Sequence, residues 1–229
     1  MRWFLLACLG WVMACRADPE LHRLIDFEQY RFGVPPKEFE YTATGPHGPV
    51  LSAGRPLWRT YVDLSAPSPK FVLLQASALA ASDHYPLALV RDVELRDVKL
   101  AVSVKVIGGK LSGAAGCVLR AQDKNNYAAV LLDSMAQRVR LVRMVDAHPK
   151  ELASARINID PGQWNKVEVI AQENEFAVWL NDRAALSAQD STMMAAGRVG
   201  LLTHADTLAE FDDFYIQNGP GRVVLGLSK

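Results

Sequence analysis

The sequence predicts an all-β fold, an antiparallel sandwich of two sheets, and three observations favour it. Hydrophobic and polar residues alternate from about residue 57 onward, which is the pattern of half-buried strands. Turn-forming residues recur at about ten-residue spacing between the alternating segments. Helical periodicity is not sustained beyond two turns outside residues 1–17. Together these features favour a single sandwich domain over a parallel α/β sheet.

The clearest predicted strand is Val98 to Val106. Its valines and Leu100 fall on one face, and Lys99, Ser103 and Lys105 fall on the other. The same period of two predicts further strands at Phe71–Gln75, Cys117–Ala121, Tyr127–Leu132, Val139–Val145, Val167–Ala171, Phe176–Leu180, Val199–Thr203 and Phe211–Ile216.

Turn residues mark where the strands reverse. Gly108-Gly109, Lys124-Asn125-Asn126, Pro161-Gly162 and Asn181-Asp182 are predicted turns, because these residue types tolerate positive φ or fit tight turns. Gly33 to Arg55 is rich in glycine and proline and is predicted as long loops over the sandwich. The domain is expected to span residues 24–217, followed by a short tail at 218–229.

Residues 1–17 are predicted to be an export signal. Arg2 precedes an uncharged, mostly apolar run from Trp3 to Ala14, which is too short to span a bilayer. Two processing routes fit: cleavage after Ala17, or lipidation of Cys15 in a segment that is similar to a bacterial lipoprotein box. We therefore expect an extracytoplasmic protein that is periplasmic, secreted or lipid-anchored, with a lipid anchor as its only attachment to a membrane.

Charge and cysteine content exclude some classes of function. The 25 Lys and Arg residues balance the 25 Asp and Glu residues, so no nucleic-acid partner is expected. Cys8 is removed with the signal, and Cys15 is either removed or lipidated. Cys117 then has no free cysteine to pair with, so no intramolecular disulfide is expected. The apolar neighbours of Cys117 favour a core residue over a nucleophile.

The order of several segments resembles bacterial exported proteins of the laminin-G/concanavalin-like superfamily, which are often labelled as 3-keto-disaccharide hydrolase or glycoside-hydrolase-like domains. The resemblance covers roughly residues 24 to 217. It implies a jelly roll, a fold that hosts lectins, glycanases and adhesion modules. The segments that carry the resemblance are Phe39 with Thr44-Gly45, Trp58, Asp63–Pro69, Val72–Gln75, Tyr85–Leu87, Arg120–Tyr127, Trp164, Ala196–Leu201, Ala205-Asp206 and Phe211–Phe214.

The sequence departs from this family at four informative positions. Ala128 and Leu131 stand where such proteins often have tyrosine and arginine, and Leu202 and His204 stand where they often have tryptophan and lysine. Tryptophan, tyrosine, lysine and arginine are side chains that stack on a sugar or bond its hydroxyls. The resemblance therefore implies that this protein has a weakened or altered site.

No complete catalytic motif is present, so no catalytic residue is predicted. A glycosidase needs two converging carboxylates, and the Glu-x-Asp-x-(x)-Glu motif of laminarinase-like jelly rolls is missing. Glu210-Phe-Asp-Asp213 is the densest acidic group, and strand alternation predicts that Asp212 and Asp213 point to opposite faces. The five histidines lack the spacing of a metal site.

Calcium is the only cofactor that the sequence suggests. Related jelly rolls often join their first and last strands through a calcium ion, so Asp212 or Asp213 is expected to meet Asp26 and Glu28 as ligands. Simple hydrogen bonding at the strand ends is the alternative for the same carboxylates.

The best-matched segments also suggest a ligand surface. They supply donors, acceptors and an aromatic ring that suit a polyol, and the alternative is that these residues only orient turns. For Trp164 and Trp179, core packing is favoured over a sugar platform. The candidate ligand residues are Arg120, Asp123, Asn126, Tyr127, His204 and Asp206.

The leading functional hypothesis is an extracytoplasmic module that binds a carbohydrate or another cell-envelope ligand without turning it over. One alternative is a glycoside-hydrolase-like enzyme that acts on a (3-keto-)disaccharide, as the family label implies. A second alternative is a structural or adhesion domain.

Overall fold

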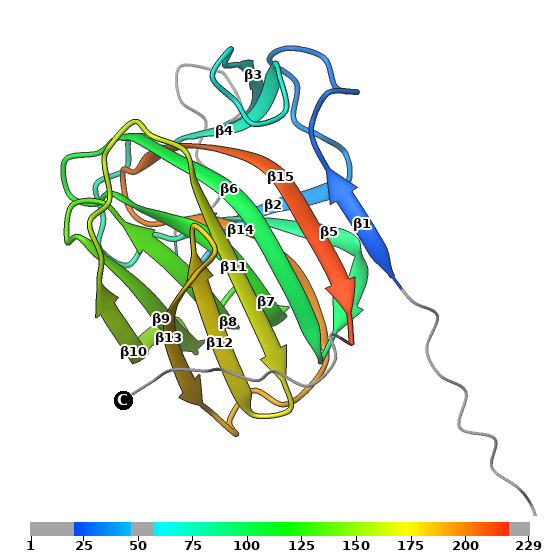
Figure 1. Ribbon diagram of the computed structural model, residues 1–229, viewed down its shortest axis with the longest axis vertical. Helices are drawn as coiled ribbons and strands as arrows, with labels where there is room; N and C mark the ends of the chain where they lie inside the picture. Colours follow the sequence, from blue (N-terminus) through cyan, green and yellow to red (C-terminus); the bar gives the residue numbers. More distant parts are fainter. Residues whose placement is uncertain (1–20, 47–56, 220–229) are drawn as a thin grey trace, which may run out of the picture.

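The computed structural model describes residues 21–46 and 57–219, which form fifteen strands in two antiparallel sheets (Figure 1). The predicted all-β jelly-roll sandwich is confirmed. Within the described residues, no helix has the length and apolar character needed to cross a membrane. The predicted signal, Cys15 and the tail from residue 220 onward lie outside the described residues.

The two sheets face each other, and Figure 1 views the molecule with the larger sheet in front. The eight-stranded sheet runs in the order β13 (Arg183–Gln189), β12 (Glu175–Leu180), β11 (Asn165–Gln172), β6 (Val98–Gly108), β15 (Leu208–Asn218), β4 (Phe71–Ala76) and β3 (Trp58–Val62), and β1 (His22–Ile25) also pairs with β15. The seven-stranded sheet runs in the order β10 (His148–Arg156), β9 (Arg138–Val145), β8 (Asn126–Asp133), β7 (Ala114–Asp123), β14 (Gly197–Thr203), β5 (Pro86–Leu95) and β2 (Phe39–Ala43).

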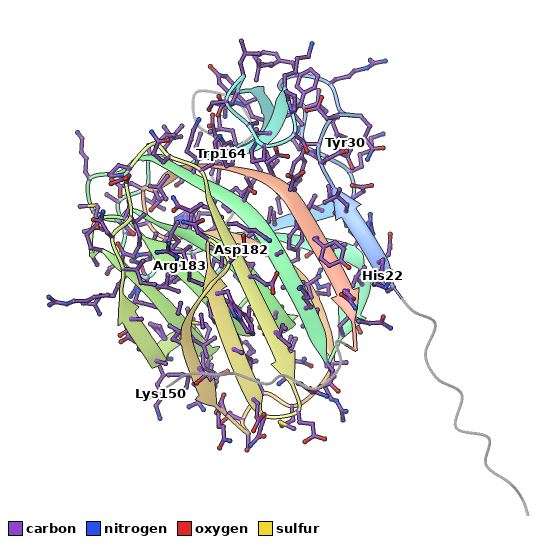
Figure 2. All side chains as sticks on the ribbon, viewed as in Figure 1. His22, Tyr30, Lys150, Trp164, Asp182 and Arg183 are labelled. Carbon is purple, nitrogen blue, oxygen red and sulfur yellow. The ribbon has the colours of Figure 1, made fainter. Side chains whose placement is uncertain are left out.

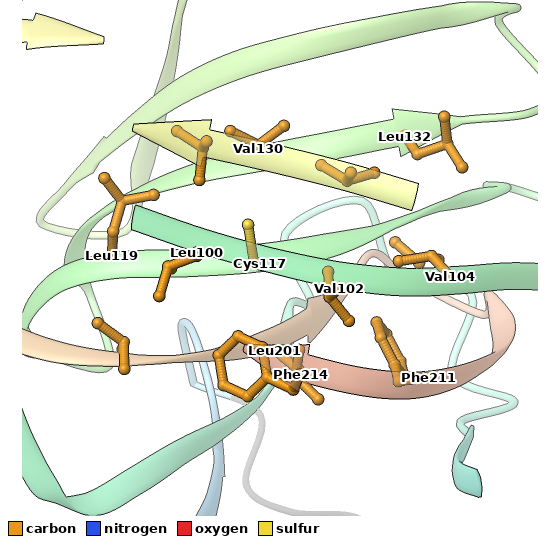
Figure 3. Close-up of a cluster of buried hydrophobic side chains, with 14 of the residues drawn as sticks. Leu100, Val102, Val104, Cys117, Leu119, Val130, Leu132, Leu201, Phe211 and Phe214 are labelled. Atoms are coloured by element: carbon orange, nitrogen blue, oxygen red, sulfur yellow. The ribbon is translucent and has the colours of Figure 1, made fainter. Parts of the chain in front are cut away.

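The core fills the space between the sheets (Figure 3). Leu100, Val102 and Val104 of β6 point into it, as the alternation predicts, and they meet side chains from the other sheet such as Leu201. Cys117 is fully buried there, and burial raises the pKa of its thiol to about 12. The prediction of a core cysteine is therefore confirmed.

All nine predicted strands are present, and the strands that the pattern missed include both edge strands of the seven-stranded sheet. Phe39–Ala43 forms β2 inside the stretch that was predicted as loops. His148–Arg156 forms β10 at the edge of its sheet, and most of its side chains are exposed. An edge strand needs no buried face, so it shows no hydrophobic alternation.

A bulge in β15 changes the faces that its acidic residues occupy. Phe211 and Phe214 both point into the core, although strict alternation would place residues three apart on opposite faces. The register shifts between Asp212 and Tyr215, and Asp213 has a φ of 47°. Asp212 and Asp213 consequently both bond to Ser68, so the prediction of opposite faces is wrong.

Candidate functional site

The structure does not bring the six candidate ligand residues together. Arg198 pairs with Ala121 near one end of β7, and Thr203 pairs with Ala115 near the other. The segment Arg120–Tyr127 therefore lies at one end of the seven-stranded sheet, and His204 and Asp206 lie at the opposite end. As a ligand site the six residues stay a prediction, and their placement argues against it.

Arg120 is a buried structural residue. Its side chain is 0% exposed and stacks on Phe176. Nε donates to the carbonyl of Arg96 at 2.6 Å, Nη1 donates to the carbonyl of Met193 at 2.9 Å, and Nη2 lies 3.6 Å from Asp97 Oδ1. The guanidinium thus ties three segments together and is not available to a ligand at the surface.

Asp123, Asn126 and Tyr127 lie where the β7–β8 turn joins β7 and β8. Asp123 Oδ1 accepts from the backbone N–H of Asn125 and from the side chain of Asn126, as the turn alternative predicts. The side chain of Tyr127 is fully buried, and its hydroxyl lies 2.8 Å from Thr44 Oγ1. Tyr127 therefore cannot present its ring to a ligand at the surface.

His204 and Asp206 lie in the connection between β14 and β15, and both bond to neighbouring segments. His204 stacks on Tyr85, its Nε2 donates to the carbonyl of Ser82 at 2.8 Å, and its Nδ1 lies 3.0 Å from the hydroxyl of Ser112. Burial lowers the pKa of His204, which favours the neutral imidazole. Asp206 accepts from three consecutive backbone N–H groups that begin at Lys110.

The outer face of the seven-stranded sheet is apolar where a sugar site would need polar groups. Leu131 and Leu202 belong to a second buried hydrophobic cluster on this face, separate from the core. Ala128 points the other way and packs in the core. The substitutions at Leu131 and Leu202 thus place apolar side chains on this face, as the comparison with the family implied.

The four carboxylates proposed for calcium all accept hydrogen bonds from nearby residues. Residues 63–70 connect β3 to β4, and Ser68 in this loop bonds to Asp212 and Asp213 at 2.8 and 2.6 Å. Glu28 accepts from the N–H of Phe71, and Asp26 accepts from the N–H of Glu28. Burial, with the nearby charges of Asp213 and Glu28, raises the pKa of Asp212 to about 7.

These contacts follow the alternative of simple hydrogen bonding. Among the residues that the structure describes, no three His, Cys, Asp or Glu side chains gather in a way that could hold a metal ion. Calcium binding stays a prediction.

Lys105 forms a closed ionic cluster at one end of the eight-stranded sheet. Its Nζ contacts Asp63 Oδ2 and lies 2.9 Å from Glu210 Oε2, and all three side chains are mostly buried. Trp164, which is labelled in Figure 2, covers the ammonium at 5.1 Å and donates from Nε1 to the hydroxyl of Ser65. Burial would raise the pKa of Asp63, but the hydrogen bonds from Lys105 and Ser65 outweigh it and lower the pKa.

Trp164 and Trp179 both lie outside the core. Trp164 is half-buried over Lys105, and Trp179 is half-buried on the outer face of β12, where it pairs with Glu168 of β11. The prediction of core packing is therefore wrong for these two side chains.

The candidate site is a groove of about 740 Å³ on the outer face of the eight-stranded sheet. We call it the sheet groove. Its floor is made by β6, and Ala101 and Ser103 are the small side chains there. Pro67 and Ser68 of the 63–70 loop and Leu24 of β1 line the groove as well. The small floor residues leave room for a ligand between larger neighbours.

Polar groups from three strands line the sheet groove. Lys99 Nζ lies 3.0 Å from Glu168 Oε1, with the two side chains 28% and 19% exposed. The hydroxyl of Tyr215 lies 2.7 Å from His22 Nδ1 and donates to Gln217. The sheet groove therefore offers an ammonium, a carboxylate, an amide and a hydroxyl that remain in contact with solvent.

The strand registers align these groups. Ala101 pairs with Glu168 on one side and with Tyr215 on the other, and Glu168 pairs with Trp179. Because neighbouring strands are about 4.8 Å apart, Trp179 and Tyr215 flank a band roughly 14 Å wide. The alternation of Val98–Val106 already placed Lys99 and Ser103 on this face, but the partners on β11 and β15 depend on the sheet order.

The fold and the sheet groove define the chain as an antiparallel jelly-roll domain with an open polar groove on one sheet. It belongs to the family described as the 3-keto-alpha-glucoside-1,2-lyase-like domain, whose model matches residues 73–217. A search of the curated proteins found no match.

Solved structures share the fold at low sequence identity. The carbohydrate-binding module CBM66 from Bacillus subtilis is 18% identical with a TM-score of 0.56, and the match covers 71% of this chain and 96% of that one. Domain 4 of AbnA, an extracellular GH43 arabinanase from Geobacillus stearothermophilus solved with arabinotriose, is 10% identical with a TM-score of 0.55, covering 79% and 82%. A Bacillus subtilis protein of unknown function with a galectin-like fold is 10% identical with a TM-score of 0.53, covering 86% and 98%.

Proposed function

We propose that this protein is a non-catalytic carbohydrate-binding module that acts outside the cytoplasm and holds its sugar in the sheet groove. The observation that carries the proposal is the row of polar groups over the small floor at Ala101. Sugar hydroxyls both donate and accept hydrogen bonds, and Lys99, Glu168 and Gln217 offer both kinds of partner. Two structural neighbours, a carbohydrate-binding module and an arabinanase domain solved with arabinotriose, agree with this class of ligand.

The aromatic side chains support the same ligand class. Tyr215 lines the sheet groove and Trp179 lies one strand beyond Glu168. Aromatic rings favour the apolar faces of sugars, and their polar edges tolerate water. The distance of roughly 14 Å between the two strands suits a ligand of about two or three sugar rings.

One argument against turnover concerns the two carboxylates of the closed ionic cluster. Asp63 and Glu210 both contact Lys105, and the side chain of Glu210 is only 5% exposed. An acid–base pair must reach the bond that it cleaves. The closed ionic cluster keeps these two carboxylates away from a ligand in solution.

Binding is tested by calorimetry after a glycan screen with the chain from Asp18 onward. Lys99→Met and Glu168→Gln should each weaken binding of the identified sugar at least about tenfold, because methionine cannot hydrogen-bond and glutamine lacks the carboxylate charge that strengthens a hydrogen bond. The matched control is Lys150→Met, which removes an exposed lysine from β10 on the other sheet. No binding to any envelope glycan, or equal losses in the control, would reject the proposal.

Membership of the lyase-like family favours a second function, the elimination of a 3-keto-α-glucoside. This reaction needs a base for the proton beside the ketone and an acid for the departing oxygen. The measurement is release of the aglycone from such a substrate, followed by proton NMR. Turnover that Glu168→Gln abolishes would replace the non-catalytic proposal with this one.

A further inference from the structure

Four exposed hydrophobic side chains gather around β3. Phe32 is 60% exposed, Leu64 is 80% exposed, and Val34 and Tyr61 are also exposed. We call these four residues the apolar patch. Figure 1 shows β3 and the loops beside it at one end of the sandwich. Exposed apolar side chains that cluster in this way mark interaction surfaces.

Backbone hydrogen bonds fix the chain beneath the apolar patch. The N–H of Gly33 donates to the carbonyl of Thr60 at 2.9 Å, and the N–H of Thr60 donates to the carbonyl of Val34 at 3.2 Å. The ring centroids of Phe32 and Tyr61 lie 5.7 Å apart. The backbone of the patch is therefore ordered before a ligand binds, which lowers the cost of binding.

Tyr61 places the apolar patch on the same face of the eight-stranded sheet as the sheet groove. Trp58 of β3 points into the core. β3 pairs with β4 without a register shift, so Tyr61, three residues further along, points to the outer face. The sheet groove lies on this outer face as well.

The strand register gives the separation of the two surfaces. One row of cross-strand partners consists of Val104, Phe211, Leu73 and Thr60. The neighbouring row begins at Ser103 on the groove floor and ends at Tyr61 in the patch. The band between Trp179 and Tyr215 ends at β15, and β3 lies two strands further in the same direction across the sheet. Two strand spacings amount to about 10 Å, which corresponds to about two sugar rings beyond the groove.

The 63–70 loop joins the two surfaces. Leu64 belongs to the apolar patch, and Pro67 lines the sheet groove. The Cα atoms of these two residues are at most about 11 Å apart. Between them in the chain is Ser65, whose hydroxyl accepts from the half-buried Trp164. A chain-like ligand that leaves the groove over Pro67 therefore meets Leu64 next.

The charges beside the apolar patch are of both signs. Arg31 and Lys70 are exposed cations at its border. The carboxylates of Glu28, Asp212 and Asp213 accept hydrogen bonds from the 63–70 loop or from the residue directly after it. A surface of mixed charge does not favour a partner that carries charge of one sign. The exposed rings of the patch suit the apolar faces of a neutral sugar instead.

We propose that the apolar patch extends the sheet groove into a longer site for neutral glycans of about four or five sugar rings. This inference rests on the proposed function of the sheet groove as a sugar site. Two or three rings fill the groove, the chain crosses the 63–70 loop beside Leu64, and a further ring lies on Phe32 and Tyr61. The patch thereby selects long glycans over short ones.

Calorimetry with oligosaccharides of two lengths tests the extension. The probes are neutral arabino-, xylo- and gluco-oligosaccharides of three and six residues, added to the chain from Asp18 onward. In at least one series the hexasaccharide should bind about tenfold or more tightly than the trisaccharide. Phe32→Ser should remove most of this gain, and Leu64→Ser should reduce it, while both variants bind the trisaccharide as the unchanged chain does. A gain that comes only from the extra registers of a longer chain would survive both substitutions.

Matched controls keep the outcomes distinct. Met135→Ser replaces a side chain that is 57% exposed outside the patch, and it should bind both lengths like the unchanged chain. Lys99→Met should weaken both lengths, because it changes the groove itself.

Three results would overturn the extension. If trisaccharides bind but hexasaccharides bind no more tightly, or if Phe32→Ser keeps the gain, the extension fails and the sugar site in the groove stands. Absence of binding at both lengths also overturns the extension, whereas the sugar site is judged by the wider glycan screen. In sedimentation velocity, a dimer that Phe32→Ser turns into a monomer would assign the patch to a second copy of the chain.

Discussion

Replacement of Lys105 by methionine should destabilise the fold strongly and in a manner that depends on pH. Lys105 holds Asp63 and Glu210, and the three side chains are 11%, 14% and 5% exposed. Methionine preserves the packing of the stem beneath Trp164 but leaves two carboxylates close together without a cation. Removing one partner of a buried ion pair costs about 3–5 kcal/mol, and we expect about 3 kcal/mol because solvent still reaches Asp63.

The pH dependence follows from Glu210. Burial raises the pKa of its carboxyl group, although Lys105 opposes this effect. A carboxyl group whose pKa is higher in the folded state binds more protons there, so its folded state loses stability as the pH rises above the ordinary value. Without Lys105 this penalty grows. The cost of Lys105→Met should therefore be larger at about pH 8 than at about pH 5, because lower pH favours the neutral form of Glu210.

Urea denaturation at both pH values measures the effect, with thermal unfolding as a second assay. A loss of about 3 kcal/mol corresponds to a fall in Tm of roughly 6–12 °C for a domain of this size. Lys99→Met is the matched control, because its pair with Glu168 is more exposed and should contribute about 1 kcal/mol or less. Lys105→Met with Glu210→Gln should regain part of the loss. A loss below about 1 kcal/mol, or an equal loss at both pH values, would refute the reasoning.

Three further predictions concern other buried groups. Arg120→Met should cost about 3 kcal/mol or more in urea denaturation, because the carbonyls of Arg96 and Met193 lose their donor, and sugar binding should persist in the folded fraction. A stable variant that no longer binds sugar would instead support the predicted role of Arg120. Calcium bound beside Asp212 at a hundredfold excess over its Kd should raise the free energy of unfolding by about 2.7 kcal/mol relative to EDTA. Asp212→Asn should remove this gain. A Tm that calcium does not change would contradict calcium binding. Cys117 should resist a thiol reagent at neutral pH until urea unfolds the chain, because the side chain is buried and its pKa is about 12. Reaction in the native protein would show that the core opens locally.

Burial of the candidate ligand residues could not be predicted from sequence. Arg120 and Tyr127 have the residue types of a sugar site, yet both are fully buried. Arg120 has a φ of 54° at a register shift in β7, and the bulge turns its side chain toward Phe176 of the other sheet. Local sequence does not specify such a bulge. The departures at Leu131 and Leu202 were the better signal, because they lie on the apolar outer face of the seven-stranded sheet.

The sequence by itself determined the class of fold, the nine strands that show hydrophobic alternation, and the core position of Cys117. These properties follow from an alternation that each strand carries locally. Tertiary structure decided which outward faces became neighbours. Ala101, Glu168 and Tyr215 lie far apart in the chain, and only the order β11-β6-β15 places them side by side to form the sheet groove. Pairing between distant strands depends on the packing of the whole sandwich, and no segment contains that information alone.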